Sequence, residues 1–241
     1  YYKDRVLKPN TRITPDGVAK EPGDFEHFRR LAYPMRDAET LAGFEAFPWP
    51  DFTEESRHEH LEERVRQLHD DGWYVTGGVG HIWETAWQGT SMEQLMRFFI
   101  EKPDIADLVL SRISANAQFK AKRFAQAGCD CIHCGDDVGM QQSLMMHPDM
   151  WREWLKPHWA RIWRSVKKIN PEAQVFYHSD GDIRDIIPDL IEMGLDILNP
   201  VQPECMDPAA LKREYGDRLA FWGCVGTQTT FPFGTPDDMR R

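Results

Sequence analysis

Short apolar runs alternate with longer amphipathic stretches from residue 54 to the end of the chain. In the stretch 54–71, Leu61, Val65 and Leu68 fall on one stripe, which is the spacing of an amphipathic helix. The run GWYVTGGVG that follows is short, apolar and rich in glycine at its end, which is typical of a buried strand. The same pattern predicts further helices over 91–101, 103–127, 148–169, 183–194 and 207–216, and further strands in CDCIHC, AQVFYH, LDILNP and LAFWGCVG.

This alternation of strands and helices predicts a parallel sheet with helices packed outside it. The strands carry little internal polarity, as expected when both faces of a sheet are covered. No G-x-G-x-x-G motif follows a strand, which argues against a dinucleotide-binding fold. We therefore predict an α/β fold of the (β/α)₈ TIM-barrel type. Pro157 is expected to bend the helix over 148–169, because proline cannot donate the hydrogen bond of a helix interior.

Both ends of the chain indicate a truncated barrel. The chain opens without methionine and closes on TPDDMRR, which resembles the first turn of a helix. Residues 1–50 are rich in proline and aromatic residues, and a turn at Pro15-Asp-Gly indicates a hairpin. We predict an N-terminal elaboration over residues 1–50 and a partial barrel domain over residues 51–241.

Composition narrows the functional classes. The chain has 241 residues, of which 41% are hydrophobic, enough to bury one substantial core. A net charge of -10 argues against binding to nucleic acid or to anionic lipid. No apolar run approaches the ~20 residues that span a bilayer, and the first residues lack the pattern of a signal peptide. Three of the five cysteines lie within 129–134, too close for a disulfide framework, so we expect reduced thiols and a cytoplasmic location.

Polar residues follow every predicted strand. In a parallel barrel the loops after the carboxyl ends of the strands build the active site, so these side chains are expected to meet around one cavity. His178 and Asp180 are two positions apart at a strand end, which lets both face the same side. In chain order the candidates are His81 and Glu84; Asp136, Asp137 and Gln141; His178, Asp180 and Asp182; Asn199, Gln202 and Cys205; Cys224 and Gln228.

Some of these residues also have purely structural interpretations. His81 could bond to backbone groups, and one aspartate of Asp136-Asp137 could cap the following helix. In the stretch CDCIHC, alternate residues of a strand share a face but lie ~6.6 Å apart, so Cys131 and His133 cannot complete a tetrahedral zinc site alone. We interpret these cysteines as small buried hydrophobic residues.

Several longer segments resemble a known family: FPWPDF, GHIWETAW, GDDVGMQQSLMMHPDMWREWLKP, FYHSDGDIRDIIPDLIEMGLDILNPVQPECMDPAALKREYG and FWGCVGTQTTFPFGTPDDMRR. From about residue 34 to its end, the chain resembles the uroporphyrinogen decarboxylase superfamily. The resemblance implies a (β/α)₈ barrel with its site in the C-terminal mouth. This superfamily contains the haem-pathway decarboxylase and zinc methyltransferases that move methyl groups between corrinoid proteins and thiols or other acceptors.

The resemblance favours the methyltransferase branch. The arginine-rich MRQAGRY signature of the decarboxylase is absent from this sequence. The methyltransferases carry H-x-C after a central strand, with a second cysteine that would fall beyond Arg241. Here His178 matches the histidine, and Asp180 stands where the first cysteine would be. Aspartate is an acceptable zinc ligand but a harder one than thiolate, which puts thiol activation in doubt.

Three functions follow from these observations. The first is methyl transfer between a small substrate and a corrinoid (cobalamin) carrier, with zinc held by His178 and Asp180 as a Lewis acid. In this first function the catalytic residues are His178 and Asp180 together with Glu84 and Asp137, and the latter two move protons or position substrate. The second is cofactor-free uroporphyrinogen decarboxylation in tetrapyrrole (porphyrin) synthesis, and the third is a non-catalytic scaffold that docks a corrinoid protein. We assign substrate binding to His81, Asp136, Gln141, Asp182, Gln202 and Gln228.

Two kinds of partner are expected besides a small-molecule substrate. One is a corrinoid protein, which the resemblance implies. The other is a second copy of the chain, because the tryptophan-rich helix over 148–169 could leave an apolar patch for a homodimer.

Overall fold

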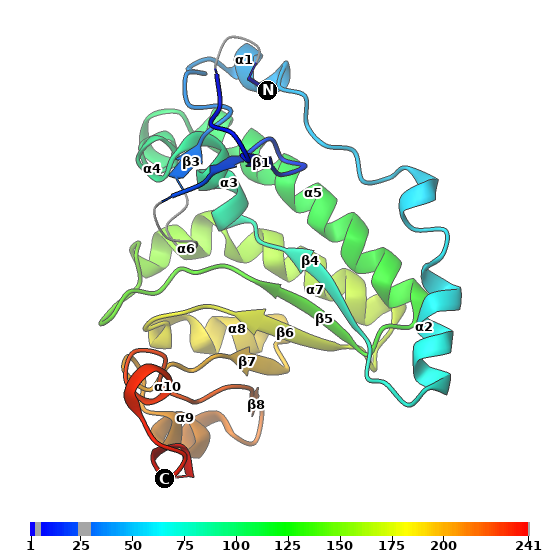
Figure 1. The fold of residues 1–241 in the computed structure, drawn as a ribbon, viewed down its shortest axis with the longest axis vertical. Coiled ribbons are helices and arrows are strands. Elements are labelled where there is room, and N and C mark those ends of the chain that lie inside the picture. The colour runs from blue at the N-terminus through cyan, green and yellow to red at the C-terminus, as the bar shows by residue number, and fades with distance from the viewer. Residues whose placement is uncertain (3–5, 24–29, 241) are drawn as a thin grey trace. The chain divides into compact units, whose positions relative to one another are not determined.

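The computed structural model describes residues 1–2, 6–23 and 30–240. The chain divides into two compact units: Tyr1–Phe52 with Ile82–Asn116, and Thr53–His81 with Ala117–Arg241. We call these the first unit and the second unit and treat each separately (Figure 1). The sequence-based division at residues 50 and 51 stays a prediction.

The first unit contains a small antiparallel sheet in the order β1-β2-β3, formed by Arg12–Ile13, Ala19–Glu21 and Arg30–Ala32. Its first turn is closed by the Thr14 amide, which donates to the Val18 carbonyl at 2.9 Å. Gly17 in this turn has a φ of 84°, a conformation that favours glycine. The sheet confirms the predicted hairpin elaboration.

Helices form the rest of the first unit. They are α1 (Leu41–Glu45), α3 (Trp83–Thr90), α4 (Met92–Glu101) and the first part of α5 (Pro103–Ala127). The ring of Phe44 meets that of Phe98 edge to face, and Trp83 stacks on Phe99. These aromatic contacts between α1, α3 and α4 form the core of this unit.

Helix α3 corrects the prediction of a loop after the first barrel strand. Ile82, Trp83 and Ala86 are fully buried, and their spacing fits one face of a short helix. The side chain of Ser91 then caps α4 by accepting from the Gln94 amide at 3.2 Å. The sequence pattern did not predict α3, because the helix is short and contains a glycine, as loops often do.

The second unit contains a parallel sheet in the order β4-β5-β6-β7-β8. Its strands are Thr76–Gly80, Cys131–Gly135, Gln174–His178, Ile197–Asn199 and Ala220–Phe221. Each lies within a run that the sequence predicts, except that β5 continues one residue further, to Gly135. Because spatial order equals chain order and all pairs are parallel, the strands are consecutive β/α repeats, as in a (β/α)₈ barrel.

Most helices of the second unit lie within the predicted stretches, although α10 was not predicted. In chain order they are η1 (Glu55–Arg57), α2 (Leu61–Asp70), the end of α5, α6 (Pro148–Trp154), α7 (Lys156–Ile169), η2 (Arg184–Ile186), α8 (Ile187–Met193), α9 (Pro208–Tyr215), α10 (Thr230–Phe233) and η3 (Asp238–Arg240). The predicted long helix is divided at Leu155, and Pro157 lies in the first turn of α7. Asp207 caps α9 by accepting from the Ala209 and Ala210 amides.

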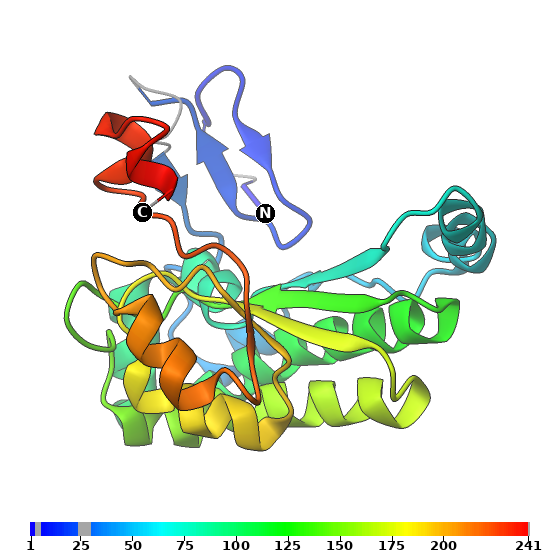
Figure 2. The ribbon, with the colours of Figure 1, turned by 90° about the horizontal axis from the view of Figure 1, so that it is seen from below.

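The parallel sheet packs against α7 and α8 on one face (Figure 2). Tyr177 of β6 is buried there against Trp159 and Trp163 of α7, with ring centroids 5.9 and 5.7 Å away. Trp159 and Trp163 are fully buried, as is Trp151 of α6. The prediction of an apolar patch on this helix is therefore wrong for these tryptophans, because they fill the core; the homodimer itself stays a prediction.

The opposite face of the sheet carries the alternate strand residues. Cys131, Phe176 and Ile197 form a buried cluster on it, and the ring of His133 stacks on Phe176 with centroids 4.3 Å apart. His178 follows Phe176 by two positions, so β6 carries it on this face. Across the parts of the chain that the structure describes, no helix is both long enough and apolar enough to traverse a bilayer.

Candidate functional site

The carboxyl ends of β5 and β6 bring three ligand-bearing side chains together. Asp137 follows β5, His178 ends β6, and Asp180 lies two residues later. One ligand atom from each of the three lies within 4.8 Å of the others. We call these residues the rim cluster, and it joins three of the four residues predicted to be catalytic.

Close contact between two loops holds the rim cluster in place. The amide of Asp182 donates to the Met140 carbonyl at 2.7 Å, and the Asp180 amide donates to Oδ1 of Asp137 at 2.9 Å. At the crossing, a Cβ on Gly139 or on Gly181 would collide with the backbone of the other loop. The glycines of GDDVGM and HSDGD therefore let the backbones meet and set Asp137 beside the residues after β6.

His178 uses both ring nitrogens. Its Nε2 lies 3.3 Å from Oδ1 of Asp137, and its Nδ1 lies 2.6 Å from Oδ1 of Asn199. The hydrogen bond to Asp137 is the main reason that the pKa of His178 rises to about 9, and Asn199 and the charge of Asp180 add to it. Burial opposes the shift. Without a metal, His178 is therefore a cation at neutral pH.

Asp137 carries the complementary charge. Burial would raise its pKa, but the contact with His178 and the hydrogen bond from the Asp180 amide outweigh burial and lower it. Asp137 is thus a carboxylate at neutral pH. This suits a role as a ligand or a positioning charge better than one as a proton donor.

Asn199 is a site residue to which the sequence assigned no role. It ends β7 directly beside His178, because the register pairs these two residues. Its Nδ2 donates to the Trp222 carbonyl after β8 at 2.5 Å. The sequence signal for Asn199 was a polar residue at a strand end. Its contact with Nδ1 of His178 follows only from the register of β6 and β7.

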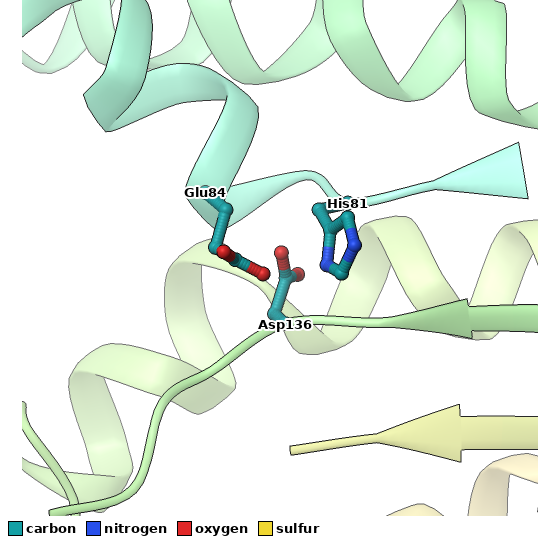
Figure 3. Close-up of side chains that lie close together, drawn as sticks. All are labelled: His81, Glu84 and Asp136. Atoms are coloured by element: carbon teal, nitrogen blue, oxygen red, sulfur yellow. The ribbon is translucent and has the colours of Figure 1, made fainter. Parts of the chain in front are cut away.

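A second pair of predicted residues lies after β4 and β5. Figure 3 draws His81 and Asp136 together with Glu84. A ring nitrogen of His81 and a carboxylate oxygen of Asp136 lie within 4.8 Å of each other. Glu84 lies in the first turn of α3 in the first unit, three positions after His81. The roles of these residues stay predictions.

Asp136 points away from the rim cluster and into the core. It is fully buried, and Oδ2 accepts from the indole Nε1 of Trp159 at 2.8 Å. The next helix, α6, is capped instead by His147, whose Nδ1 accepts from the Asp149 amide at 3.3 Å. The prediction that Asp136 or Asp137 caps the following helix is therefore wrong, because the segment 138–147 separates them from it.

The remaining predicted substrate residues lie in the same loops with other partners. Asp182 is buried and forms an ion pair with Arg184, and Gln202 is buried and accepts from the Gly181 amide at 3.4 Å. Gln141 accepts from the thiol of Cys205 at 3.0 Å. The backbone amide of Gln228, an exposed residue, donates to Glu204 at 3.0 Å. Substrate contacts for these four side chains stay predictions.

The cysteines of CDCIHC are buried free thiols. Burial is the main reason that the pKa of Cys129 and that of Cys131 rise to about 11, and burial raises the pKa of Cys134 further. The thiol of Cys134 donates to the Phe176 carbonyl at 3.1 Å. These residues pack the strand as neutral thiols, as the sequence predicts.

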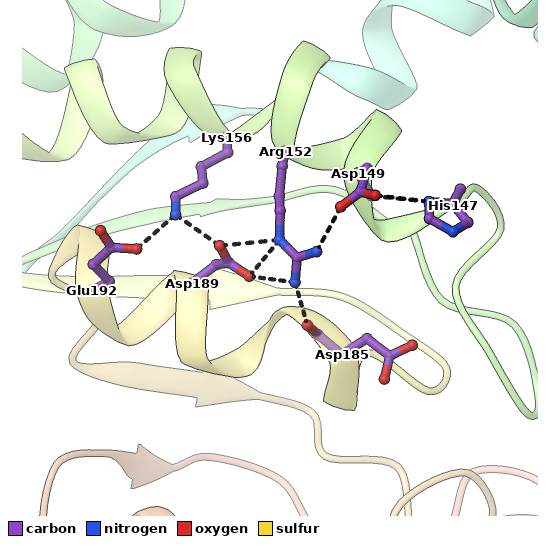
Figure 4. A network of polar contacts seen from close by, with 7 residues as sticks. All are labelled: His147, Asp149, Arg152, Lys156, Asp185, Asp189 and Glu192. Atoms are coloured by element: carbon purple, nitrogen blue, oxygen red, sulfur yellow. Dashed lines mark hydrogen bonds and ion pairs between the residues drawn. The ribbon is translucent and has the colours of Figure 1, made fainter.

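A network of ion pairs joins the outer helices α6, α7 and α8 (Figure 4). Asp189 of α8 accepts from Lys156 of α7 at 2.7 Å and from Arg152 of α6 at 3.1 Å. Lys156 also contacts Glu192 at 2.6 Å. These charges are paired with one another and fasten α8 to its neighbours, so the network is structural.

Comparison with known proteins gives the family. The family model for uroporphyrinogen decarboxylase (URO-D) matches residues 30–241. The chain belongs to the uroporphyrinogen decarboxylase family. This membership, together with the consecutive parallel β/α repeats, confirms the predicted barrel fold.

Two proteins to which the chain is similar are methyltransferases. The chain is 25% identical over 150 residues to the methylcobamide:CoM methyltransferase MtaA of Methanosarcina barkeri, covering 62% of this chain and 42% of that protein. Its fold is similar to that of a methyltransferase from Methanosarcina mazei, with a TM-score of 0.62 and 20% identity over 87% of this chain and 60% of that one. The chain thus spans less than two thirds of the length of either relative.

The rim cluster fits a divalent metal ion. An imidazole nitrogen and two carboxylate oxygens are ligand types that zinc accepts, and catalytic zinc sites use three protein ligands and keep one position open. Zinc holds such atoms ~2.0–2.2 Å away, so ligand atoms within 4.8 Å of one another need shifts of about 1 Å to share one ion. The carboxylates make the site harder than a thiolate site.

Proposed function

We propose that the chain is part of a methyltransferase that moves a methyl group between a small substrate and a corrinoid carrier, with zinc held by Asp137, His178 and Asp180. The observation that carries the proposal is the approach of three ligand atoms to within 4.8 Å at the carboxyl ends of the strands. Support also comes from the family and from the similarity to a methylcobamide:CoM methyltransferase.

The side chains of the rim cluster have separate roles in this proposal. His178 gives up its Nε2 proton to become a ligand, while Asp137 and Asp180 supply negative charge that holds a cation. Zinc, when bound, supplies Lewis acidity that polarises the methyl-bearing or methyl-accepting atom.

The residues after β4 and in the neighbouring loops bind the substrate in this proposal. His81 and Glu84 lie close together in the chain, and Glu84 positions substrate or moves a proton. Gln141, Gln202 and Gln228 offer amide groups, and Asp136 and Asp182, which contact Trp159 and Arg184, offer carboxylates. A corrinoid protein is the expected partner, because the relative from Methanosarcina barkeri is a methylcobamide:CoM methyltransferase.

Zinc content tests the metal site directly. The wild-type protein should retain about one zinc per chain after dialysis, and His178→Ala should lose it. The matched control is His69→Ala, which removes another histidine that contacts an aspartate at 2.9 Å but lies at the opposite ends of the strands. Wild-type protein that binds no zinc, or His178→Ala that keeps it, would contradict the proposed site.

Methyl transfer tests the reaction class. With methylcobalamin as donor and a panel of small thiols, amines and alcohols as acceptors, the wild-type protein should produce demethylated cobalamin, and Asp180→Ala should not. Incubation with uroporphyrinogen separates the decarboxylase alternative, for which coproporphyrinogen would appear without zinc. Binding to a corrinoid protein with neither activity would favour the docking scaffold.

A further inference from the structure

We propose that Asn199 is a positioning residue that fixes His178 in the tautomer with hydrogen on Nδ1, and so presents Nε2 as the ligand atom beside Asp137. The inference rests on the proposed function and deepens it, since it names the side chain that prepares the metal ligand.

The orientation of the Asn199 amide follows from its contact with Trp222. The partner there is a backbone carbonyl, which can only accept a hydrogen bond. The amide atom that lies 2.5 Å from it must therefore be the donor, Nδ2. Oδ1 then lies on the other side of the amide, 2.6 Å from Nδ1 of His178.

The orientation of the amide in turn decides the tautomer of the ring. An amide oxygen can only accept, so Nδ1 of His178 must carry a hydrogen to make this contact. The opposite contact, between Nε2 and Asp137, is longer at 3.3 Å, whereas a charge-assisted hydrogen bond is usually ~2.7–2.9 Å. Because Nε2 is the nitrogen that faces Asp137, its proton is the one that a metal bound there would displace.

The backbone makes this arrangement rigid. His178 and Asn199 are paired in the register of β6 and β7, and the Trp222 amide donates to the Leu198 carbonyl at 3.0 Å. The three residues thus lie on neighbouring strand ends. Rotation of the amide by 180° would set its oxygen against the Trp222 carbonyl, which replaces a hydrogen bond with a repulsion.

Fixing the second nitrogen of a histidine ligand is known to govern metal affinity. Partners of the non-ligating nitrogen orient the ring, and their loss typically weakens binding about 10- to 100-fold. The expected effect of removing the Asn199 oxygen is therefore on affinity and tautomer, while zinc keeps the same direct ligands.

Nitrogen NMR of the metal-free protein tests the inference. With ¹⁵N-labelled histidine and at a pH of about 10 or above, where the ring is neutral, His178 should show a hydrogen-bearing Nδ1 and a bare Nε2. Asn199→Leu should shift the hydrogen to Nε2, where Asp137 accepts it. Asn199→Asp should keep it on Nδ1, because a carboxylate oxygen also accepts there. The signal of His69 serves as the internal control, and His178→Gln assigns the resonances.

A neutral His178 with its hydrogen on Nε2 in the wild-type protein would overturn the inference, as would an unchanged pattern in Asn199→Leu. If Asn199→Leu does not fold, Asn199→Ala removes the same oxygen with less added volume. Zinc affinity, measured against a chromophoric chelator, should fall about 10- to 100-fold in Asn199→Leu and stay within a few-fold in Asn199→Asp. Zinc binding by the wild-type protein tests the proposed function independently, since the tautomer is read without metal.

Discussion

A histidine meets an aspartate at each end of the parallel sheet, and the two pairs differ in what else they contact. At the amino ends of the strands, Asp130 accepts from Nε2 of His69 at 2.9 Å and from the Val75 amide at 2.7 Å. At the carboxyl ends, Asp137 lies 3.3 Å from Nε2 of His178 and accepts from the Asp180 amide at 2.9 Å. Each carboxylate thus holds one imidazole and one backbone amide.

The difference lies in where the histidines come from. His69 belongs to α2, outside the sheet, so its contact fastens a helix to the strands. Asp196 repeats this arrangement, because it accepts from the Val175 amide and from Lys167 of α7. His178 instead ends a strand, and its second nitrogen meets Asn199 of the next strand. The amino ends therefore serve stability, whereas the carboxyl ends gather ligand atoms, as the division of labour in barrels predicts.

The largest expected effect on zinc binding comes from replacing an aspartate by alanine at one end of the sheet and comparing it with the same replacement at the other end. Asp137→Ala should weaken zinc binding by a few hundred-fold or more, because four ligands together supply ~10–16 kcal/mol in structural zinc sites. Asp130→Ala should leave zinc binding unchanged but lower the free energy of unfolding by about 1–3 kcal/mol, since the Val75 amide loses its acceptor. Zinc titration and urea unfolding of both variants measure this. Equal effects of the two changes on zinc would remove the distinction.

The pH dependence of zinc binding should be the next largest effect. The pKa of His178 is raised to about 9, so below that pH a proton occupies the ligand nitrogen and competes with zinc. Apparent affinity should therefore rise about tenfold per pH unit from pH 7, roughly 100-fold by pH 9, and then level off. Titrations at buffered free zinc test this, with His69→Ala expected to give the same curve. A flat profile would contradict Nε2 of His178 as a ligand.

Replacing one hard ligand should have a smaller effect. Asp180→Cys introduces the softer sulfur that zinc prefers, so its affinity for zinc should rise about tenfold while that for magnesium falls. The matched control is Asp185→Cys, an exposed residue of η2 outside the rim cluster. If both variants gain equally, the thiol acts without the other ligands, and Asp180 does not belong to the site.

The sequence predicted the strands well because each is a short apolar run with a sharp polar or glycine end. The orientation of adjacent residues was harder to predict, since successive positions of an extended chain point to opposite sides. Asp136 and Asp137 appear equivalent in the sequence, yet one meets Trp159 in the core and the other meets His178. Their difference depends on which helix lies behind β5, and no local pattern contains that information.

The contacts of Asn199 could not be predicted for a related reason. Its partner depends on the register of β6 against β7, and one residue of slip would turn its side chain to the helix-facing side. The short helix α3 shows another limit, because its burial depends on packing against α4 rather than on a long periodic pattern. Elements with a clear local pattern were therefore predictable, while the partners of single side chains were not.

The smallest expected effect tests the amino ends of the strands alone. Lys167 and Asp196 form an ion pair at 2.8 Å, and about a third of each side chain is exposed, so water and salt screen their attraction. Lys167→Ala should lower the free energy of unfolding by at most about 1 kcal/mol, and by less in high salt, because Asp196 keeps its hydrogen bond from the Val175 amide. Asp196→Ala should lower it more, since that amide then has no carboxylate to accept its hydrogen. Urea unfolding at two salt concentrations separates these contributions, and zinc binding should not change in either variant. A loss of zinc in Lys167→Ala would mean that the two ends of the sheet are coupled, which contradicts a separation of stability at the amino ends from ligand binding at the carboxyl ends.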